Sequence, residues 1–253
     1  MGLVQFELSN GERRVGVVEG DQVREVHAAR TVRDLALAAI EAGVTLQQQI
    51  DHLGLGESHD YAELLAGHKI LPPLDHPDPA HTLVSGTGLT HLGSAAARDK
   101  MHQNASDESA MTDSMRIFKW GVEGGKPASG QTGVQPEWFY KGDGSIVVRP
   151  GRPFPWPAFA EDAGEEPEIA GIYVIGSDGT PFRIGFALAN EFSDHVTERV
   201  NYLFLAHSKL RPCSLGPELI VGDLPADIRG SSRILRKGKA IWEKPFLSGD
   251  DDM

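Results

Sequence analysis

The chain has 253 residues, of which 40% are hydrophobic and 24% are charged, a composition typical of a globular protein with a sizeable core. Its 36 acidic and 24 basic residues give a formal net charge of −12, and no basic stretch extends beyond a few residues, which argues against a nucleic-acid-binding surface. The single cysteine, Cys213, excludes an internal disulfide, and no apolar run of about 18 residues is present. We therefore expect a cytoplasmic protein with neither nucleic-acid nor membrane partners.

The amino-terminal part has the pattern of a small α/β domain. Residues 3–27 alternate between apolar and polar positions as short strands separated by turn signals. Residues 31–42 predict a helix, with Thr31 as its N-cap. A second helical stretch is expected over about residues 45–67.

A proline-rich segment separates this part from the rest of the chain. Four prolines between residues 71 and 79 predict an extended linker. The chain then becomes mainly β, with strand candidates at residues 82–85, 145–149, 166–175, 181–189, 218–221 and 233–242. The sequence thus predicts an α+β, mainly β fold with a small α/β domain (1–70), a linker (71–80) and a mixed-β domain (81–253).

One predicted helix, over residues 91–102, has a polar stripe able to take part in catalysis. The stripe consists of His91, Arg98 and His102, with Ser94 at its edge. Such a stripe can simply face solvent. Alternatively, the helix is a lid that presents a general base and a cation to an anionic substrate, with the glycine-rich residues 121–135 as its flexible part.

A predicted β-hairpin brings three carboxylates to one face of a sheet. Two runs rich in apolar residues flank an Asp178-Gly179 turn. In a hairpin with this turn, the residue numbers of any two residues that face each other across the strands add up to the same value. Glu191 therefore lies opposite Glu166, with Cβ atoms about 5 Å apart, and Glu168 projects on the same side. Because Pro167 cannot donate to a sheet ladder, the first strand is expected to begin irregularly.

Three like charges at this spacing are destabilising unless a proton or a metal ion intervenes. Glutamates on a strand can also simply face water, but the apolar residues around this hairpin indicate that it is buried. Hard cations such as Mg²⁺ and Ca²⁺ prefer oxygen ligands. We therefore predict a divalent-cation site formed by Glu166, Glu168 and Glu191.

The residues of this hairpin carry a resemblance to a known family. The stretches Gly-Glu-Glu-Pro-Glu-Ile-Ala (164–170) and Gly-Phe-Ala-Leu-Ala-Asn-Glu-Phe-Ser-Asp (185–194) resemble the Glu-x-Glu and Asn-Asp-x-Ser-x-x-Asp signatures of the fumarylacetoacetate hydrolase superfamily. The resemblance covers roughly residues 80–225 and implies a distorted β-roll. It also implies that the three glutamates bind Mg²⁺, Mn²⁺ or Ca²⁺, although Glu191 stands where the family usually has aspartate.

Two lysines extend the resemblance. Phe139-Tyr-Lys141 is similar to the family's Phe-x-Lys, whose lysine contacts substrate, and Ser208-Lys209 with Gly216-Pro217 resembles its Gly-Lys…Gly-Pro element. Either lysine alone is more often a solvated side chain than part of a site. The resemblance implies that Lys141 and Lys209 bind substrate, and Arg98 is a further candidate to neutralise its charge.

Two departures from the family pattern bear on activity. The chain reads Thr90-His-Leu-Gly-Ser94 where the hydrolases have Asn-Tyr-x-x-His, so Ser94 replaces the histidine that activates water. This segment, together with residues 190–195 and 207–211, looks most similar to the bacterial 2-keto-3-deoxy sugar-acid (arabinonate) dehydratases. The chain also ends at Met253, before the family's carboxyl-terminal segment, so we expect a wall of the site and a dimer contact to be missing.

The resemblance implies a metal-dependent enzyme acting on a small 2-oxo acid, and a homodimer. In the expected reaction, a cation chelated by the substrate stabilises the enolate formed when the C3 proton leaves, and loss of the C4 hydroxyl completes a dehydration. His91, Ser94 and Lys141 are the candidate catalytic residues. The alternatives are a C–C bond hydrolase or decarboxylase on a diketo acid, and a non-catalytic metal-dependent binding protein.

Overall fold

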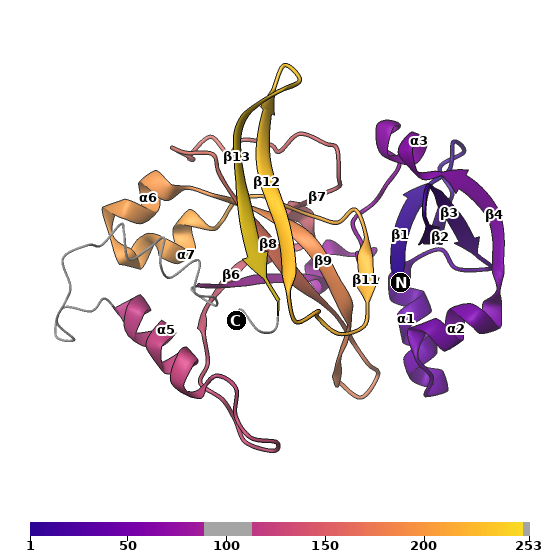
Figure 1. Cartoon of the computed structure of the whole chain (residues 1–253), viewed down its shortest axis with the longest axis horizontal. Helices are drawn as coiled ribbons and strands as arrows, with labels where there is room; N and C mark the ends of the chain where they lie inside the picture. The colour runs from indigo at the N-terminus through magenta and orange to yellow at the C-terminus, as the bar shows by residue number, and fades with distance from the viewer. Residues whose placement is uncertain (89–112, 250–253) are drawn as a thin grey trace. The chain divides into compact units, whose positions relative to one another are not determined.

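The computed structural model describes residues 1–88 and 113–249 (Figure 1). The predicted helix over residues 91–102, with His91, Ser94, Arg98 and His102, lies outside the described residues. The chain divides into two compact units, one formed by Met1–Val84 with Lys141–Asp223 and the other by Ser85–Tyr140 with Leu224–Met253. Among the described residues, no helix is long and apolar enough to cross a membrane.

A nine-stranded sheet organises the first unit, in the order β4-β3-β2-β1-β11-β9-β10-β7, with β8 paired to β9. β1 pairs antiparallel with β11, so the amino-terminal strands belong to the same sheet as the predicted carboxylate hairpin. The strands are β1 (Gly2–Glu7), β2 (Arg13–Glu19), β3 (Gln22–Val26), β4 (Leu55–Asp60), β7 (Val147–Val148), β8 (Gly164–Ile175), β9 (Pro181–Ser193), β10 (Cys213–Leu215) and β11 (Leu219–Val221).

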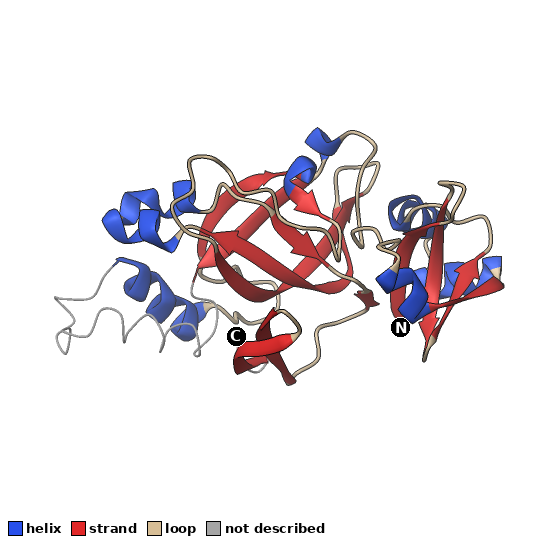
Figure 2. Ribbon diagram, turned by 90° about the horizontal axis from the view of Figure 1, so that it is seen from above, coloured by secondary structure: helices blue, strands red, loops and turns tan. Residues whose placement is uncertain are grey.

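The predicted amino-terminal strands and first helix are confirmed, whereas the second helical stretch was only partly right. α1 (Val32–Ala42) begins at Thr31, whose hydroxyl accepts a hydrogen bond of 3.0 Å from the Asp34 amide. The stretch predicted as helix is instead α2 (Leu46–Leu53), β4 and α3 (Tyr61–Ala66). Gly54, with φ of 78°, ends α2, and the following residues pair with β3 as an edge strand. Figure 2 shows these helices flanking the small amino-terminal group of strands.

The hydrophobic core joins the amino-terminal elements to the hairpin. Leu3 on β1, Val15 on β2 and Leu35 on α1 pack in one buried cluster with Ile172 on β8 and Ala187 on β9. Burial of these apolar side chains removes them from water and holds the inner face of the hairpin against the amino-terminal strands. The carboxylates of the hairpin therefore stand on a strand pair with a fixed position in the sheet.

The predicted register of the hairpin is confirmed at its functional end, where Glu166 pairs with Glu191. The predicted two-residue turn is wrong, because the Gly176 amide donates to the Thr180 carbonyl and closes a three-residue loop. A bulge between Ile172 and Tyr173 compensates for the extra residue, since Ile172 pairs with Gly185 and Tyr173 with Arg183. The longer loop and the bulge shift the strand register in opposite directions, so the pairing of the two glutamates is the same as predicted.

Two residues of the hairpin have backbone roles. Pro167 sits in regular pairing with Asn190, so the expected irregular start is wrong. β9 is the strand that pairs with β8 in the described sheet, so β8 lies at an edge, where the missing amide of Pro167 is tolerated. At the bulge, Gly185 has a φ of 155°, and a Cβ there would lie 2.1 Å from the Ile220 carbonyl oxygen, so β11 approaches too closely for a side chain.

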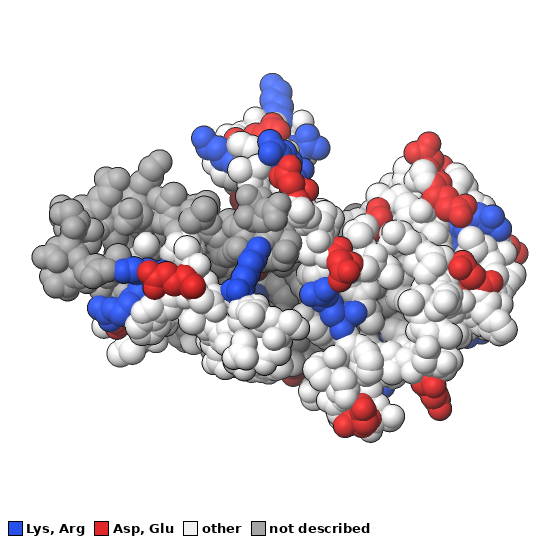
Figure 3. Space-filling model, turned by 60° about the horizontal axis from the view of Figure 1, so that its bottom comes forward, with Lys and Arg blue, Asp and Glu red and all other residues white. Residues whose placement is uncertain are grey.

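The remaining strands form two separate pairs, β5 (Leu83–Gly88) with β6 (Glu137–Asp143), and β12 (Ile228–Arg236) with β13 (Lys239–Ser248). The single strand predicted over residues 233–242 is instead this second hairpin, because Lys237 and Gly238 both have positive φ, as a tight two-residue turn requires. Figure 3 shows basic side chains gathered on this hairpin. They are Arg229, Arg233, Arg236, Lys237, Lys239 and Lys244.

Short helices complete the described chain. The glycine-rich segment predicted over residues 121–135 begins inside a helix, α5, because its first four residues continue the preceding helical turns. The helices not yet named are η1 (Pro79–His81), α5 (Asp113–Gly124), η3 (Gly144–Ile146), α6 (His195–Val200), η4 (Tyr202–Phe204) and α7 (Leu205–Ser208). α6 and α7 follow the end of β9 directly and so place their residues beside the glutamates.

Candidate metal centre

The three predicted carboxylates converge at the open end of the β8–β9 hairpin. Oxygen atoms of Glu166, Glu168 and Glu191 all lie within 4.8 Å of one another. Glu191 is buried, with 5% of its surface exposed, whereas Glu166 is half-buried and Glu168 lies at the solvent-exposed rim. The geometry arises because cross-strand partners project to one side, and Glu168 follows two residues after Glu166 on that side.

Both predicted lysines reach this carboxylate cluster. The Lys209 ammonium donates to both carboxylate oxygens of Glu166 at 2.8 Å and to the Ser193 hydroxyl at 3.0 Å, and it lies 3.7 Å from Glu191 Oε2. The Lys141 ammonium lies 3.1 Å from Glu191 Oε1. The two ammonium groups thus partly neutralise the charge of the three carboxylates.

His195 also belongs to the cluster, and the sequence had not singled it out. Its Nε2 lies 2.8 Å from Glu166 Oε1, and its Nδ1 lies 3.5 Å from an oxygen of Asp162. Asp194 caps α6 and so makes His195 the first residue of the helix, directly after the ligand-bearing strand. A Cβ on Gly164 would lie 2.1 Å from His195 Nδ1, so the ring packs against the bare backbone of β8. Asp194, a residue type favoured at the N-cap, was the sequence feature that could have indicated a helix beginning at His195.

The three glutamates have different affinities for protons. The pKa of Glu168 is raised to about 8, first because surrounding protein atoms partly desolvate its carboxylate and then because Glu191 and Glu166 repel its negative charge. Burial also raises the pKa of Glu191, although both lysines partly oppose this shift. For Glu166, burial is outweighed by His195 and Lys209, which hold its pKa well below the usual range. The hydrogen bond to Glu166 in turn raises the pKa of His195.

The donor chemistry of the cluster fits a hard divalent cation. All three candidate ligands offer carboxylate oxygen, the donor that Mg²⁺, Mn²⁺ and Ca²⁺ prefer. Cys213 on β10 is the residue paired with Glu191, but burial raises the pKa of its thiol to about 11, so it stays protonated. Lys209 and Lys141 only partly offset the burial and like-charge repulsion that raise the pKa of Glu168, so a divalent cation beside this carboxylate would favour its ionised form.

Metal uptake is therefore expected to depend on pH. Because the pKa of Glu168 is raised to about 8, the carboxyl is mainly protonated at neutral pH, and an incoming cation must displace that proton. We expect Mg²⁺ affinity to rise by about tenfold per pH unit up to about pH 8 and then to level off. Titration calorimetry at pH 7 in buffers of different ionisation enthalpy should detect the released proton, and binding without proton release would contradict this assignment.

A buried ion pair stabilises the loop and the helix next to the carboxylate cluster. Asp194 and Arg211 are both fully buried as side chains and lie 2.8 Å apart. Asp194 also accepts hydrogen bonds from the amides of Glu161 and Thr197, and Arg211 stacks over the ring of Phe159 at 4.6 Å. Burial alone would raise the pKa of Asp194, but these amides and Arg211 hold it well below its usual range. The pair ties the loop before β8 to the helix that carries His195.

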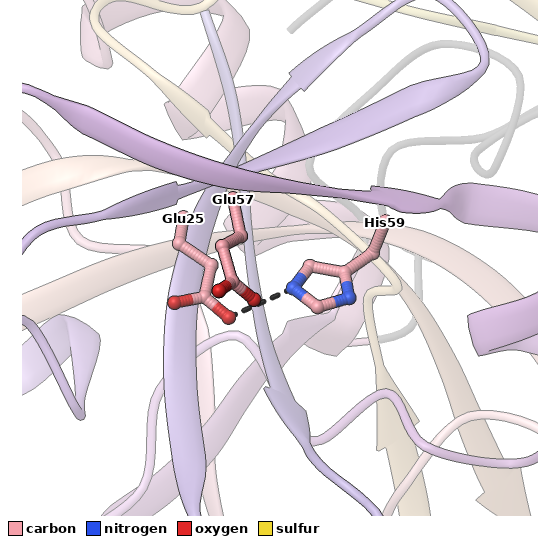
Figure 4. A group of neighbouring side chains, drawn as sticks. All are labelled: Glu25, Glu57 and His59. Carbon is pink, nitrogen blue, oxygen red and sulfur yellow. Dashed lines mark hydrogen bonds and ion pairs between the residues drawn. The ribbon is translucent and has the colours of Figure 1, made fainter.

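A second group of potential ligands lies on the amino-terminal strands. Figure 4 shows Glu25 on β3 and Glu57 and His59 on β4 turned toward one another. His59 Nε2 lies 2.7 Å from Glu25 Oε1, and the other oxygen of Glu25 lies 3.3 Å from Arg14 Nε. Because both oxygens of Glu25 already have hydrogen-bonding partners, this group is explained as a local network of polar contacts.

Of the predicted site residues, the structure thus brings together Glu166, Glu168, Glu191, Lys141 and Lys209. His91, Ser94 and Arg98 lie outside the described part of the chain, and their roles stay predictions.

Solved structures of other proteins share the fold of this chain. No protein-family model matches the sequence, and no curated protein matches it either. Among solved structures, a 2-keto-3-deoxyarabinonate dehydratase matches with a TM-score of 0.64 and 19% identity, over 100% of this chain and 78% of that one. A 2-keto-3-deoxy-D-arabinonate dehydratase complexed with magnesium and 2,5-dioxopentanoate gives a TM-score of 0.62 and 19% identity, over 97% of this chain and 76% of that one.

A hydrolase shares the same architecture. Fumarylacetoacetate hydrolase from the psychrophilic Exiguobacterium antarcticum matches with a TM-score of 0.55 and 16% identity, over 97% of this chain and 75% of that one. The predicted α+β, mainly β fold is confirmed by these neighbours. The chain therefore has the fold of the fumarylacetoacetate hydrolase superfamily, and it resembles the 2-keto-3-deoxy-arabinonate dehydratases among its structural neighbours.

Proposed function

We propose that this chain is a divalent-metal-dependent lyase that dehydrates a 2-keto-3-deoxy sugar acid such as 2-keto-3-deoxy-arabinonate. The observation that carries the proposal is the convergence of three carboxylates within 4.8 Å of one another, with two buried lysines beside them. The fold shared with a dehydratase complexed with magnesium and 2,5-dioxopentanoate supports the substrate class. We further propose that the enzyme acts in the cytoplasm as a homodimer.

Each residue of the cluster has a distinct task in this proposal. Glu166, Glu168 and Glu191 would hold Mg²⁺, or Mn²⁺ or Ca²⁺ in its place. When bound, such a cation supplies Lewis acidity, which lowers the cost of removing a proton from C3 of a 2-oxo acid. Lys209, whose ammonium already bridges Glu166 and Ser193, contributes positive charge for the substrate carboxylate.

The proton-transfer step is assigned to residues beyond the cluster. His91 is proposed to accept the C3 proton, with Arg98 compensating substrate charge and Ser94 beside them. Loss of one proton from C3 and of the hydroxyl from C4 removes one water molecule from the substrate. The product of this loss is a C3=C4 enone with a hydroxyl on C5. Movement of a proton from C5 to C3 gives a C4=C5 enol, which tautomerises to an aldehyde at C5.

Incubation with Mg²⁺ and 2-keto-3-deoxy-arabinonate tests the proposal directly. We expect a product lighter than the substrate by one water molecule, with a new aldehyde detectable by a carbonyl reagent. Chelation of the metal should abolish turnover and added Mg²⁺ should restore it. Tight binding of the substrate without any turnover would contradict the lyase and favour a non-catalytic metal-dependent binding protein.

A second candidate is a C–C bond hydrolase or decarboxylase acting on a diketo acid. The fold shared with the Exiguobacterium fumarylacetoacetate hydrolase favours it. The serine at position 94, where the hydrolases have their water-activating histidine, counts against it. Incubation with an acylpyruvate distinguishes the two, because a hydrolase releases two carboxylic acids whereas the lyase leaves the carbon chain intact.

A further inference from the structure

Lys141 is buried in a way that leaves its ammonium fully engaged with the protein. Only 3% of its surface is exposed. The ammonium donates to the carbonyl oxygens of Phe192 and Lys209 at 2.9 Å each and lies 3.1 Å from Glu191 Oε1. Since an ammonium group has three N–H donors, these three acceptors use its whole capacity.

We propose that Lys141 is a positioning residue for the metal centre rather than a contact for the substrate. It would hold the Glu191 carboxylate in its ligating orientation and fix the backbone on which Lys209 stands. This inference rests on the proposed metal-dependent function, and it assigns to Lys141 a role different from the substrate contact expected from the sequence.

The partners of Lys141 explain how one side chain can order the site. Phe192 directly follows Glu191, so Lys141 contacts both the Glu191 carboxylate and the backbone next to it. Its third partner is the carbonyl of Lys209, the residue that ends α7. Lys141 on β6 therefore connects the end of β9 to the end of α7.

The two lysines differ in the kind of partner that they have. Two of the three acceptors of Lys141 are backbone carbonyls, which no ligand can remove. The described partners of Lys209 include side chains, among them the Glu166 carboxylate and the Ser193 hydroxyl. A cation bound by Glu166 would compete with Lys209 for the same oxygens, which would release the Lys209 ammonium toward a substrate while Lys141 stays in place.

Variants at the two lysines should therefore separate metal binding from ligand binding, with Mn²⁺ and oxalate as the probes. We expect Lys141→Met to weaken Mn²⁺ binding by about 10- to 100-fold, the usual effect of losing a partner that orients a ligand, and to leave oxalate affinity unchanged once Mn²⁺ is saturating. Lys209→Met should do the reverse, weakening oxalate binding without weakening Mn²⁺ binding. Electron paramagnetic resonance of free Mn²⁺ measures the first quantity, and calorimetry measures the second.

A matched variant controls for a general loss of stability. Ile70→Ala also removes a buried side chain, but Ile70 packs with Val4 and Phe6 in the amino-terminal cluster rather than beside a candidate ligand. If Lys141→Met acted only by loosening the fold, Ile70→Ala would weaken Mn²⁺ binding as much, and that result would overturn the inference. Unchanged Mn²⁺ affinity in Lys141→Met, or a loss confined to oxalate, would overturn it as well.

A measurement on the unaltered protein keeps the inference testable if Lys141→Met does not fold. In protein labelled with ¹⁵N-lysine, the Lys141 ammonium protons should exchange slowly with water and keep their chemical shift when oxalate is added to the Mg²⁺-loaded protein. The Lys209 signal, identified by its absence from Lys209→Met, should move. An oxalate-dependent shift of Lys141 would overturn the inference alone, whereas failure of the unaltered protein to bind Mn²⁺ would overturn the proposed function and this inference with it.

Discussion

Replacing Glu168 with glutamine is expected to weaken Mg²⁺ binding by at least about 100-fold, because one of three carboxylate ligands loses its charge. The same change should stabilise the metal-free protein against unfolding at neutral and alkaline pH. Glu168 forms no hydrogen bond or ion pair among the described residues, and its raised pKa shows that ionising it in the folded state is unfavourable. A residue that impairs folding but is needed for binding is typical of a functional site.

The sign of the stability effect follows from the direction of the shift. A carboxyl whose pKa is higher in the folded than in the unfolded state costs stability as pH rises from its unfolded pKa toward about 8. Urea unfolding of the metal-free variant and of the parent at pH 6 and pH 9 should therefore show a larger gain for the variant at pH 9.

Glu165→Gln is the matched control for this variant. Glu165 precedes Glu166 on β8 and pairs with Phe192, so its side chain projects to the opposite face of the hairpin. It should leave Mg²⁺ affinity unchanged. Equal losses of affinity in the two variants would mean that net charge, rather than ligation, governs binding.

Replacing Arg211 with methionine is expected to destabilise the protein by about 3 to 5 kcal/mol, because it leaves the Asp194 carboxylate buried without its cation. Arg211 also donates to the carbonyls of His207 and Leu210, so the turn after α7 loses two further hydrogen bonds. The free energy of unfolding in urea measures the effect, and the denaturant dependence should stay close to that of the parent protein.

Arg183→Met provides the comparison for an exposed ion pair. Arg183 lies 2.7 Å from Asp223, but 42% and 94% of the two side chains are exposed to solvent. Water screens such a pair, so the loss should be below about 1 kcal/mol. Similar losses in the two arginine variants would contradict the importance assigned to the buried Asp194–Arg211 pair.

The sequence predicted the part of the site that depends on local periodicity. The pairing of Glu166 with Glu191 followed from strand alternation and the position of the turn, both of which act over short distances along the chain. The prediction of the turn itself was wrong by one residue, and it reached the right pairing because the bulge near Ile172 added the opposite shift. Register was thus predictable only where the two irregularities cancel.

Features that depend on tertiary contacts were not predictable. β4 has no apolar periodicity of its own and exists because its residues can pair with the edge of β3. The role inferred for Lys141 depends on carbonyl groups 51 and 68 residues away, which no spacing rule indicates. His195 reaches Glu166 because Asp194 caps a helix immediately after β9, and the buried Arg211 fixes that cap.

The most direct test of the central claim is the position of a bound cation. A crystal structure of the protein with Mn²⁺ and oxalate, using the anomalous signal of manganese, locates the ion without assumptions about its ligands. The account predicts one strong peak within coordination distance of Glu166, Glu168 and Glu191, with oxalate on the same ion and Lys209 beside it. Manganese bound elsewhere, or oxalate bound away from these glutamates, would contradict the account.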